Sequence, residues 1–265
     1  MEILCVGNEL LIGKILNTNS QWLSKRATTL GIQVRQITVV ADNIEEIARA
    51  LHEILARKPK FVITTGGLGP TFDDKTLEGI AKALDRKLKV HKKALKMVKE
   101  RYNHYLGKRK TGQTKVETAR IKMARLPQGT EPLRNPVGTA PGVKINIDGT
   151  LLAALPGVPP EMKAIFEESL APLLKKEGGE KTFFERSIYF RGIMESALAP
   201  LIDQVMSGNQ SVYIKSHPKG LKEGIEIHFS TTSKDSGKAR EILEKAMTQL
   251  SELAQAQGAE VKLEE

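Results

Sequence analysis

The chain has 265 residues, of which 40% are hydrophobic and 27% charged, with a formal net charge of +10. This length suits one large and one small domain, and no apolar run reaches the ~20 residues that span a bilayer, which excludes a membrane-spanning protein. An apolar strand begins at the first residue without a leader pattern, and the single cysteine, Cys5, excludes an internal disulfide, so we expect a cytoplasmic protein with a core thiol.

Hydrophobic periodicity predicts alternating strands and helices over the first 65 residues. We expect strands at 1–6, 32–40 and 61–65, separated by amphipathic helices at 19–30 and 43–56. This alternation is typical of an α/β domain in which helices cover both faces of a parallel sheet. In such three-layer domains ligands bind at the carboxyl ends of the strands, so function is expected there.

A glycine-rich run follows the third predicted strand. Residues 64–71 read Thr-Thr-Gly-Gly-Leu-Gly-Pro-Thr and precede a predicted helix at 74–84. Glycines in this position let the backbone approach a phosphate closely and turn its N–H groups toward it. The run lacks the endings of a P-loop and the spacing of a dinucleotide fingerprint, so neither motif applies. A purely structural turn is the alternative.

Carboxylates lie next to this run. Asp73 and Asp74 would repel a bound phosphate unless a divalent cation bridges them, and oxygen ligands suit Mg²⁺ or Mn²⁺. Glu9 follows the first strand and is expected at the same edge of the sheet. The sequence therefore predicts Glu9, Asp73 and Asp74 as metal ligands and catalytic groups, with capping of the next helix by Asp73 or Asp74 as the alternative.

The positive charge is concentrated in one segment. Residues 82–125 hold 16 Lys or Arg against Asp85, Glu100 and Glu117, which gives this segment +13 and the rest of the chain −3. We expect a helix at 92–105 and a mobile loop at 107–114. The segment is interpreted as a solvated helical face, with steering of phosphorylated ligands or polyanions as the alternative.

Turns, a hairpin and a helix complete the first domain. Strands at 143–147 and 151–155 flank an Asp148-Gly149 turn, and a helix is expected at 161–174. The glycine-containing stretches at 135–142 and 155–161 offer backbone donors to a ligand or serve as rigid turns. Both interpretations remain open.

A charged linker with paired glycines at 175–181 separates two expected domains, residues 1–175 and 181–265. The second is expected to be a small α+β, KH-like module. Its elements are strands at 182–191, 211–216, 224–231 and 260–263 and helices at 195–206 and 236–257. RNA binding by a KH domain needs a Gly-x-x-Gly loop, which this module lacks, so no nucleic-acid partner is expected. The five histidines show no zinc-site spacing.

Several motifs together resemble one protein family. They are Gly7-Asn-Glu-Leu-Leu-x-Gly13, Asn17-Thr-Asn19, the glycine-rich run through Asp73-Asp74, Asn135-Pro-x-Gly-Thr-Ala-Pro-Gly142 and Leu155-Pro-Gly-Val-Pro-x-Glu-Met162. This combination resembles the N-terminal region of the competence/damage-inducible CinA proteins over nearly the whole chain. The first domain is similar to the molybdopterin-binding fold of MoaB, MogA and MoeA, and the second to the KH-like module of CinA.

The resemblance implies metal-dependent hydrolysis of ADP-ribose to AMP and ribose 5-phosphate by a homodimer that uses Mg²⁺, Mn²⁺ or Co²⁺. CinA proteins often carry a further C-terminal domain that deamidates nicotinamide mononucleotide, and we expect no deamidase activity here. One position departs from the pattern, because the molybdopterin relatives commonly have Gly-Asp-Glu where this chain has Gly7-Asn8-Glu9. An amide is a poorer metal ligand than a carboxylate.

Two other functions remain open beside this hydrolase. One is a molybdopterin-binding or adenylylating protein, and the other is a non-catalytic nucleotide or nucleic-acid binding protein. The hydrolase and the pterin-binding protein use the same cleft, whereas the third function uses the basic segment 82–125. No membrane partner is expected. The predicted substrate-binding residues are Gly7, Asn8, Thr65, Gly66, Gly67, Leu68, Gly69, Thr71, Asn135, Gly138, Pro156 and Gly157.

Overall fold

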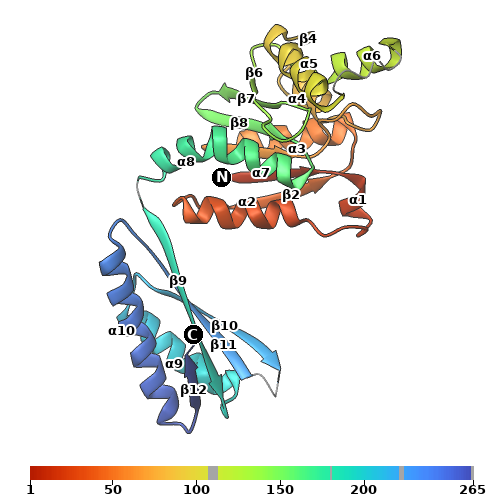
Figure 1. Ribbon diagram of the computed structural model, residues 1–265. Helices are drawn as coiled ribbons and strands as arrows, with labels where there is room; N and C mark the ends of the chain where they lie inside the picture. The colour runs from red at the N-terminus through yellow and green to blue at the C-terminus, as the bar shows by residue number, and fades with distance from the viewer. Residues whose placement is uncertain (107–112, 180, 221–223, 264–265) are drawn as a thin grey trace. The chain divides into compact units, whose positions relative to one another are not determined.

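The computed structural model describes residues 1–106, 113–179, 181–220 and 224–263. It divides into two compact units, which are Met1–Ala27 with Ile32–Lys176, and Thr28–Gly31 with Glu177–Glu265 (Figure 1). The first unit is an α/β sheet domain and the second a small α+β domain, which confirms the predicted fold class. None of the described helices combines the length and apolarity needed to cross a membrane.

The first unit is built on a sheet with the strand order β2-β1-β3-β8-β7-β6. Strands β2, β1, β3 and β8 run parallel to one another, whereas β7 is antiparallel to both β8 and β6. The bounds are β1 Glu2–Val6, β2 Gln36–Val40, β3 Phe61–Thr65, β6 Glu131–Leu133, β7 Gly142–Ile147 and β8 Thr150–Leu155. The predicted hairpin therefore adds an antiparallel edge to the parallel sheet.

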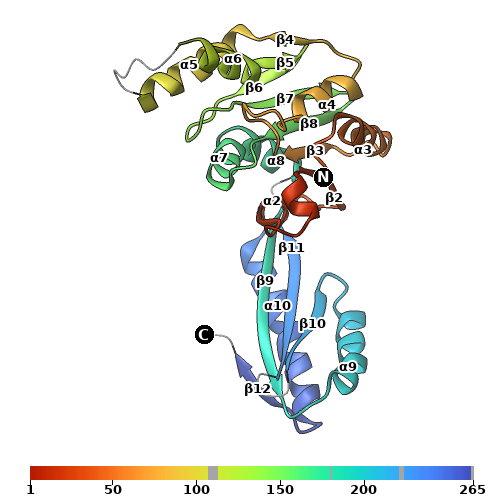
Figure 2. The ribbon, with the colours of Figure 1, turned by 90° about the vertical axis from the view of Figure 1, so that its right-hand side faces the viewer.

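Helices cover both faces of this sheet. Figure 2 shows α2 (Thr18–Thr29), α7 (Pro159–Ile165) and α8 (Ala171–Glu177) on one side and α3 (Ile44–Ala56) and α4 (Thr76–Ala83) on the other. A π-helical turn, Phe166–Leu170, joins α7 to α8. Since both faces are covered, β1 and β3 are buried along their whole length.

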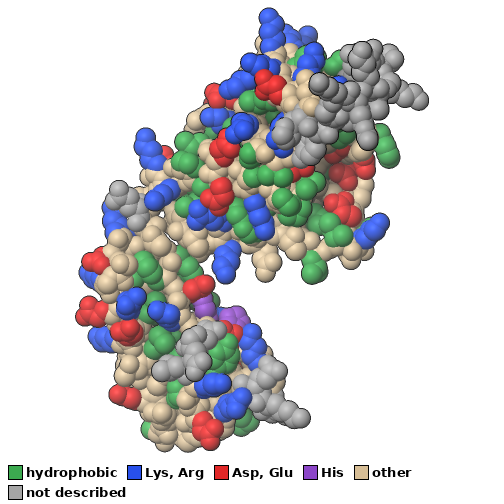
Figure 3. Space-filling model, viewed as in Figure 1, with side chains coloured by type: hydrophobic (Ala, Val, Ile, Leu, Met, Phe, Trp, Pro, Cys, Tyr) green, Lys and Arg blue, Asp and Glu red, His purple; other side chains and the backbone are tan. Residues whose placement is uncertain are grey.

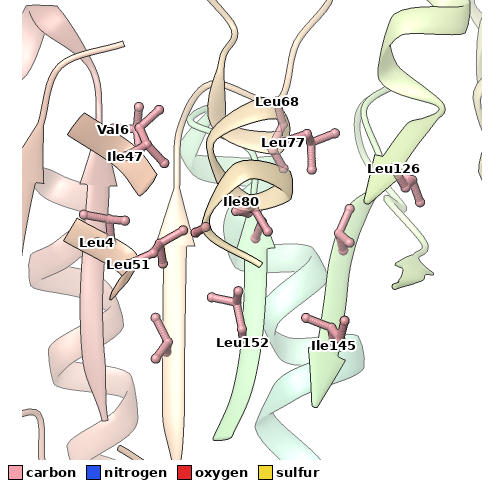
Figure 4. Packing of buried hydrophobic residues seen from close by; sticks show 14 of the residues in the cluster. Leu4, Val6, Ile47, Leu51, Leu68, Leu77, Ile80, Leu126, Ile145 and Leu152 are labelled. Atoms are coloured by element: carbon pink, nitrogen blue, oxygen red, sulfur yellow. The ribbon is translucent and has the colours of Figure 1, made fainter. Parts of the chain in front are cut away.

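The main core of the first unit lies between the sheet and α3 and α4. Leu4 and Val6 of β1 point toward Ile47 and Leu51 of α3, and the side chains of α4 continue this layer (Figure 4). Each such side chain contributes about 1.5–3 kcal/mol by leaving water. This burial stabilises the packing of β1 and β3, so the carboxyl ends of the two strands keep fixed positions relative to each other.

Several elements differ from the sequence-based expectations. Helix α5 (Lys92–Leu106) confirms the predicted helix, but α6 begins at Gln113, so Gln113 and Thr114 are helical and do not end a loop. The rest of the predicted loop, 107–112, lies outside the described residues. Strands β4 (Leu88–Val90) and β5 (Arg125–Pro127) pair with each other and were not predicted. Three residues are too few to show periodicity, and only pairing defines them.

The second unit is an antiparallel sheet with the order β10-β11-β9-β12, covered by α9 (Glu195–Gly208) and α10 (Ser236–Gln255). The strands are β9 Thr182–Arg191, β10 Tyr213–Gly220, β11 Gly224–Ser233 and β12 Glu260–Leu263. One sheet face, including Phe190 and Phe229, packs on the helices, while the opposite face carries polar residues. The predicted order of strands and helices is confirmed.

Candidate functional site

The site lies where the strand order of the first unit reverses. Strand β1 pairs with β2 on one side and with β3 on the other, so the chain leaves β1 in one direction and returns on the opposite side. At such a switch point the loops after the two central strands diverge and leave a crevice. The loops in question begin at Gly7 and Gly66, and the loop after β8 begins beside them at Pro156.

Gly66 marks the closest approach of these loops. Its φ is 106°, and a Cβ at this position would lie 2.1 Å from the carbonyl oxygen of Val6. Its N–H donates to the carbonyl of Leu155 at 3.1 Å. Gly67 also has positive φ, at 63°. Only glycine combines this backbone geometry with this proximity, so the loop geometry explains both glycines.

Hydrogen bonds from Thr76 to two carbonyl groups of the glycine-rich loop hold this loop in place. Thr76 donates from its hydroxyl to the Gly66 carbonyl at 2.8 Å and from its N–H to the Gly67 carbonyl at 3.1 Å. Within the described residues, no acceptor is assigned to the N–H groups of Gly67, Leu68 and Gly69. Consecutive backbone donors in such a turn form an anion-binding concavity. The Leu68 side chain is buried in the core, so only its backbone is available to a ligand.

The floor of the cleft is a hydrogen-bonded junction between three loops. The Thr65 hydroxyl donates to the Pro156 carbonyl at 3.0 Å and accepts from the Asn19 amide at 3.0 Å. Asn19 also donates to the Gly157 carbonyl at 2.8 Å. Thr65, Pro156 and Gly157 therefore support the glycine-rich loop from below. Asn19 does the same, although the sequence identified it only as part of the Asn17-Thr-Asn19 motif.

Thr71 organises the two aspartates. Its hydroxyl lies within hydrogen-bonding distance of the carboxylates of Asp73 and Asp74, and its N–H donates to Asp74 at 2.8 Å. The hydrogen bond from Thr71 is the main reason that the pKa of Asp73 is lowered. Both aspartates thus belong to a tight turn. This arrangement combines the predicted binding residue Thr71 with the predicted catalytic pair.

Asp42 is a fourth carboxylate at this edge, which the sequence analysis did not include. Asn8 donates its N–H to Asp42 at 2.8 Å, and its side-chain oxygen accepts from the Asp42 N–H at 3.4 Å. Burial raises the pKa of Asp42, and the charges of Glu9, Asp73 and Asp74 raise it further. Acidic side chains gather on this side of the unit, where α1 (Asn8–Leu11) lies (Figure 3).

The predicted metal ligands are not arranged as a metal site. Across the part of the chain that the structure describes, no group of three or more His, Cys, Asp or Glu side chains is placed to hold a metal ion. Thr71 bonds to one oxygen of Asp73 and one of Asp74, and the Glu9 carboxylate lies over Gly7, where a Cβ would be 2.5 Å from Oε1. A divalent cation at Glu9, Asp73 and Asp74 stays a prediction, and no step through a metal follows from this geometry.

Asn135 and Gly138 belong to a self-contained turn. The Asn135 amide donates to Glu161 at 2.6 Å and to a backbone carbonyl, while its oxygen accepts from two backbone N–H groups, including that of Gly138. Arg101 donates to the Gly138 carbonyl at 2.9 Å. A Cβ on Gly138 would overlap the Glu161 carboxyl group. This geometry agrees with the rigid-turn interpretation of this stretch.

Two cations border the glycine-rich loop. A narrow pocket of about 30 Å³ lies against the glycine-rich loop at 67–69 and is also lined by two cations, Lys122 and Arg125, and two carboxylates, Asp74 and Glu78. Lys122 donates from its ammonium group to the Thr71 carbonyl. Both cations belong to the basic segment 82–125. The sequence identified the charge of this segment but did not place these two residues at the glycine-rich loop. A pocket of this size holds one small group, such as a phosphate oxygen or a water molecule.

A mainly parallel sheet with a glycine-rich loop at its switch point is an architecture in which ligands bind at the carboxyl ends of the strands. Comparison with known families defines it further. The family described as "Probable molybdopterin binding domain" matches residues 2–176, and the chain belongs to this family.

Similar proteins span almost the same length. A protein of Aeropyrum pernix is 45% identical over 258 residues, which cover 95% of this chain and 93% of the relative. One of Pyrobaculum calidifontis is 45% identical over 254 residues, covering 95% and 94%. The solved structure of "the protein CinA with unknown function" from Thermoplasma acidophilum is 37% identical, with a TM-score of 0.57, and covers 67% of this chain and 97% of that one. The resemblance to the CinA N-terminal region is thereby confirmed.

Proposed function

We propose that the cleft binds a phosphorylated pterin of the molybdopterin type, with its phosphate at the glycine-rich loop. One observation carries this proposal, namely that the N–H groups of Gly67, Leu68 and Gly69 have no assigned acceptor within the described residues. Lys122 and Arg125 lie beside two of these residues. Backbone donors next to cations suit a phosphate group. Membership in the molybdopterin-binding family supports the same ligand class.

The carboxylates beside the glycine-rich loop suit the pterin ring, which is the end of the ligand opposite the phosphate. A pterin ring carries an amino group and a ring N–H along one edge, and an ionised carboxylate accepts two hydrogen bonds of this kind at once. Asp73 remains ionised because its pKa is lowered, and its side chain is exposed beside the loop. The phosphate would therefore contact cations and backbone N–H groups, whereas the ring edge would contact a carboxylate. If the pterin is held together with ATP, the reaction would be adenylylation with release of pyrophosphate.

Equilibrium binding of phosphorylated pterin tests this proposal. We expect Lys122→Ala to weaken binding about 10- to 100-fold, because a hydrogen bond to a charged group is worth about 1.5–3 kcal/mol. Lys96→Ala removes the same charge from a residue that is 77% exposed and paired only with Glu100, so it serves as the matched control. Absence of binding to the unaltered chain, or equal losses in the two variants, would contradict the proposal.

Metal-dependent hydrolysis of ADP-ribose is the second candidate. The crowding of Asp42 by three other carboxylates favours it, since a divalent cation would relieve the repulsion that raises the pKa of Asp42. In this reaction water adds to one phosphorus, the bridging P–O bond breaks, and AMP and ribose 5-phosphate are released.

Product analysis separates the two candidates. ADP-ribose is incubated with Mg²⁺, Mn²⁺ or Co²⁺, with EDTA and Asp73→Asn as controls. Metal-dependent AMP release that is lost in Asp73→Asn would establish the hydrolase. Intact ADP-ribose together with tight pterin binding would contradict the hydrolase and support pterin binding.

A further inference from the structure

One edge of β9 in the second unit is only partly paired. Strand β11 pairs with β9 along its full length, whereas β12 pairs only with residues 188–191. In the described ranges, no strand pairs with residues 182–187 on the β12 side, and Figure 2 shows β12 beside only one end of β9. Such an edge presents backbone N–H and C=O groups to solvent. The stretch contains Phe183 and Phe184 and neither proline nor lysine, and its two charged residues, Glu185 and Arg186, are of opposite sign.

A groove of about 1160 Å³ runs beside this open edge. One wall is a stripe along α10 with three- to four-residue spacing, which includes Arg240, Glu244, Met247, Ser251 and Gln255. The other wall is the β9 edge, and Val261 of β12, which pairs with Phe190, also lines the groove. The groove therefore follows the direction of the unpaired strand.

The groove has an apolar floor and a polar rim. Phe184, Met247 and Val261 are partly buried against the core of this unit. Arg186 and Arg240 lie at the rim and form no ion pair with any described residue. An apolar centre within a polar rim is the usual composition of a protein interaction site.

We propose that this groove binds an extended peptide segment of a partner protein, which adds a strand to β9 along residues 182–187. A polypeptide is the ligand class that offers alternating N–H and C=O groups at the strand repeat of about 3.3 Å. Its alternate apolar side chains would contact Phe184 and Met247, and an acidic residue would pair with Arg186 or Arg240. Glu185, Glu226, Glu244 and Glu252 also line the groove, which disfavours a nucleic acid.

Peptide selection against the full chain tests this proposal, which is independent of the pterin-binding proposal. Peptides recovered from a random display library are synthesised, and their affinities are measured by calorimetry. We expect Met247→Lys to weaken binding at least about tenfold, since it places a charge on the apolar floor. Glu241→Lys also adds a lysine to α10, but outside the groove on an exposed position, and is expected to change affinity less than about twofold.

Hydrogen exchange supplies a second measurement, because strand addition must slow exchange of amides within residues 182–187. Enriched peptides that bind Met247→Lys normally, or leave these amides unprotected, would overturn the proposal. So would a selection that enriches no peptide. Self-association of the chain that Met247→Lys abolishes would instead identify a second copy as the occupant, and salt-sensitive RNA binding at the groove would identify a nucleic acid.

Discussion

Gly66 lets the loops after β1 and β3 approach each other closely, and we expect its substitution to destabilise the fold strongly. A Cβ would meet the Val6 carbonyl at 2.1 Å, and φ is 106°. We expect Gly66→Ala to lower the free energy of unfolding by more than about 3 kcal/mol, since strain and backbone overlap add. Gly13 has φ 69° with nothing within 4 Å of its Cβ position, so Gly13→Ala should cost only about 1 kcal/mol. Urea unfolding compares the two, and equal losses would contradict this account.

Asp42 is expected to couple stability to pH. Its raised pKa means that the folded chain holds the proton more tightly than the unfolded chain, so its ionisation destabilises the fold as pH rises. Asp42→Asn keeps an acceptor for the Asn8 N–H and removes the charge. We expect the variant to melt at a higher temperature than the unaltered chain at neutral pH. This difference should vanish below the ordinary aspartate pKa of about 3.9, and a constant difference across pH would refute the explanation.

Adjacent threonines of β3 are expected to respond in opposite ways to the same substitution. The Thr64 hydroxyl is buried and has no hydrogen-bond partner among the described residues, so Thr64→Val should be neutral or stabilising by about 1 kcal/mol. The Thr65 hydroxyl bonds to Pro156 and Asn19, so Thr65→Val should cost about 1–3 kcal/mol. Denaturant unfolding of both variants measures the difference. A comparable loss at Thr64 would show that its hydroxyl has a partner.

Site residues were predictable where their chemistry is local. Gly66 and Gly67 follow a buried strand, and that context alone indicates a loop in close contact with a neighbour. Asp42 lies between a predicted strand and a predicted helix, and Lys122 lies in the basic segment 82–125, so neither was predicted to lie at this edge. Their place depends on strand order, which a single sequence does not contain. The role of Asn135 was open for the same reason, because its partner Glu161 lies 26 residues away.

Two helices, one in each unit, begin with side-chain caps that can be tested as a pair. Asn43 accepts from two backbone N–H groups at the start of α3, and Asp235 does the same for α10. We expect Asn43→Ala and Asp235→Ala each to cost about 1 kcal/mol. Asn43→Gly and Asp235→Gly should each cost only a few tenths of a kcal/mol, because glycine at a cap position retains most of the helix stability that alanine loses. Failure of glycine to do so, measured by urea unfolding, would point to a role other than capping.

Elements with a strong periodic pattern were predicted well, and short ones were not. Helix α3 buries one continuous apolar face, and the hairpin β7–β8 turns at Asp148-Gly149 with positive φ at both residues. Strands β4 and β5 exist only because Leu88 pairs with Pro127 across a long insertion. Pairing between distant three-residue segments leaves no local signature.

Each unit of the molecule has buried hydrophobic residues that pack among themselves within the described part of the chain. We therefore expect calorimetry to resolve two unfolding transitions. Asn43→Ala should lower the midpoint of one, and Asp235→Ala that of the other. A single transition shifted by both variants would show that the units unfold together. The chain divides at Lys176, close to the linker expected at 175–181. The homodimer expected from the resemblance stays a prediction.

The cleft floor joins parts of the chain that are made at very different times. The Thr65–Pro156 hydrogen bond spans 91 residues, and the Asn19–Gly157 bond spans 138. At synthesis rates of about 5–20 residues per second, a nascent chain carries the glycine-rich loop without its supporting floor for on the order of ten seconds. Neither bond can form before residue 156 has left the ribosome. Ligand capture is therefore expected only after release of most of the first unit, and long-range closure of this kind favours slow folding.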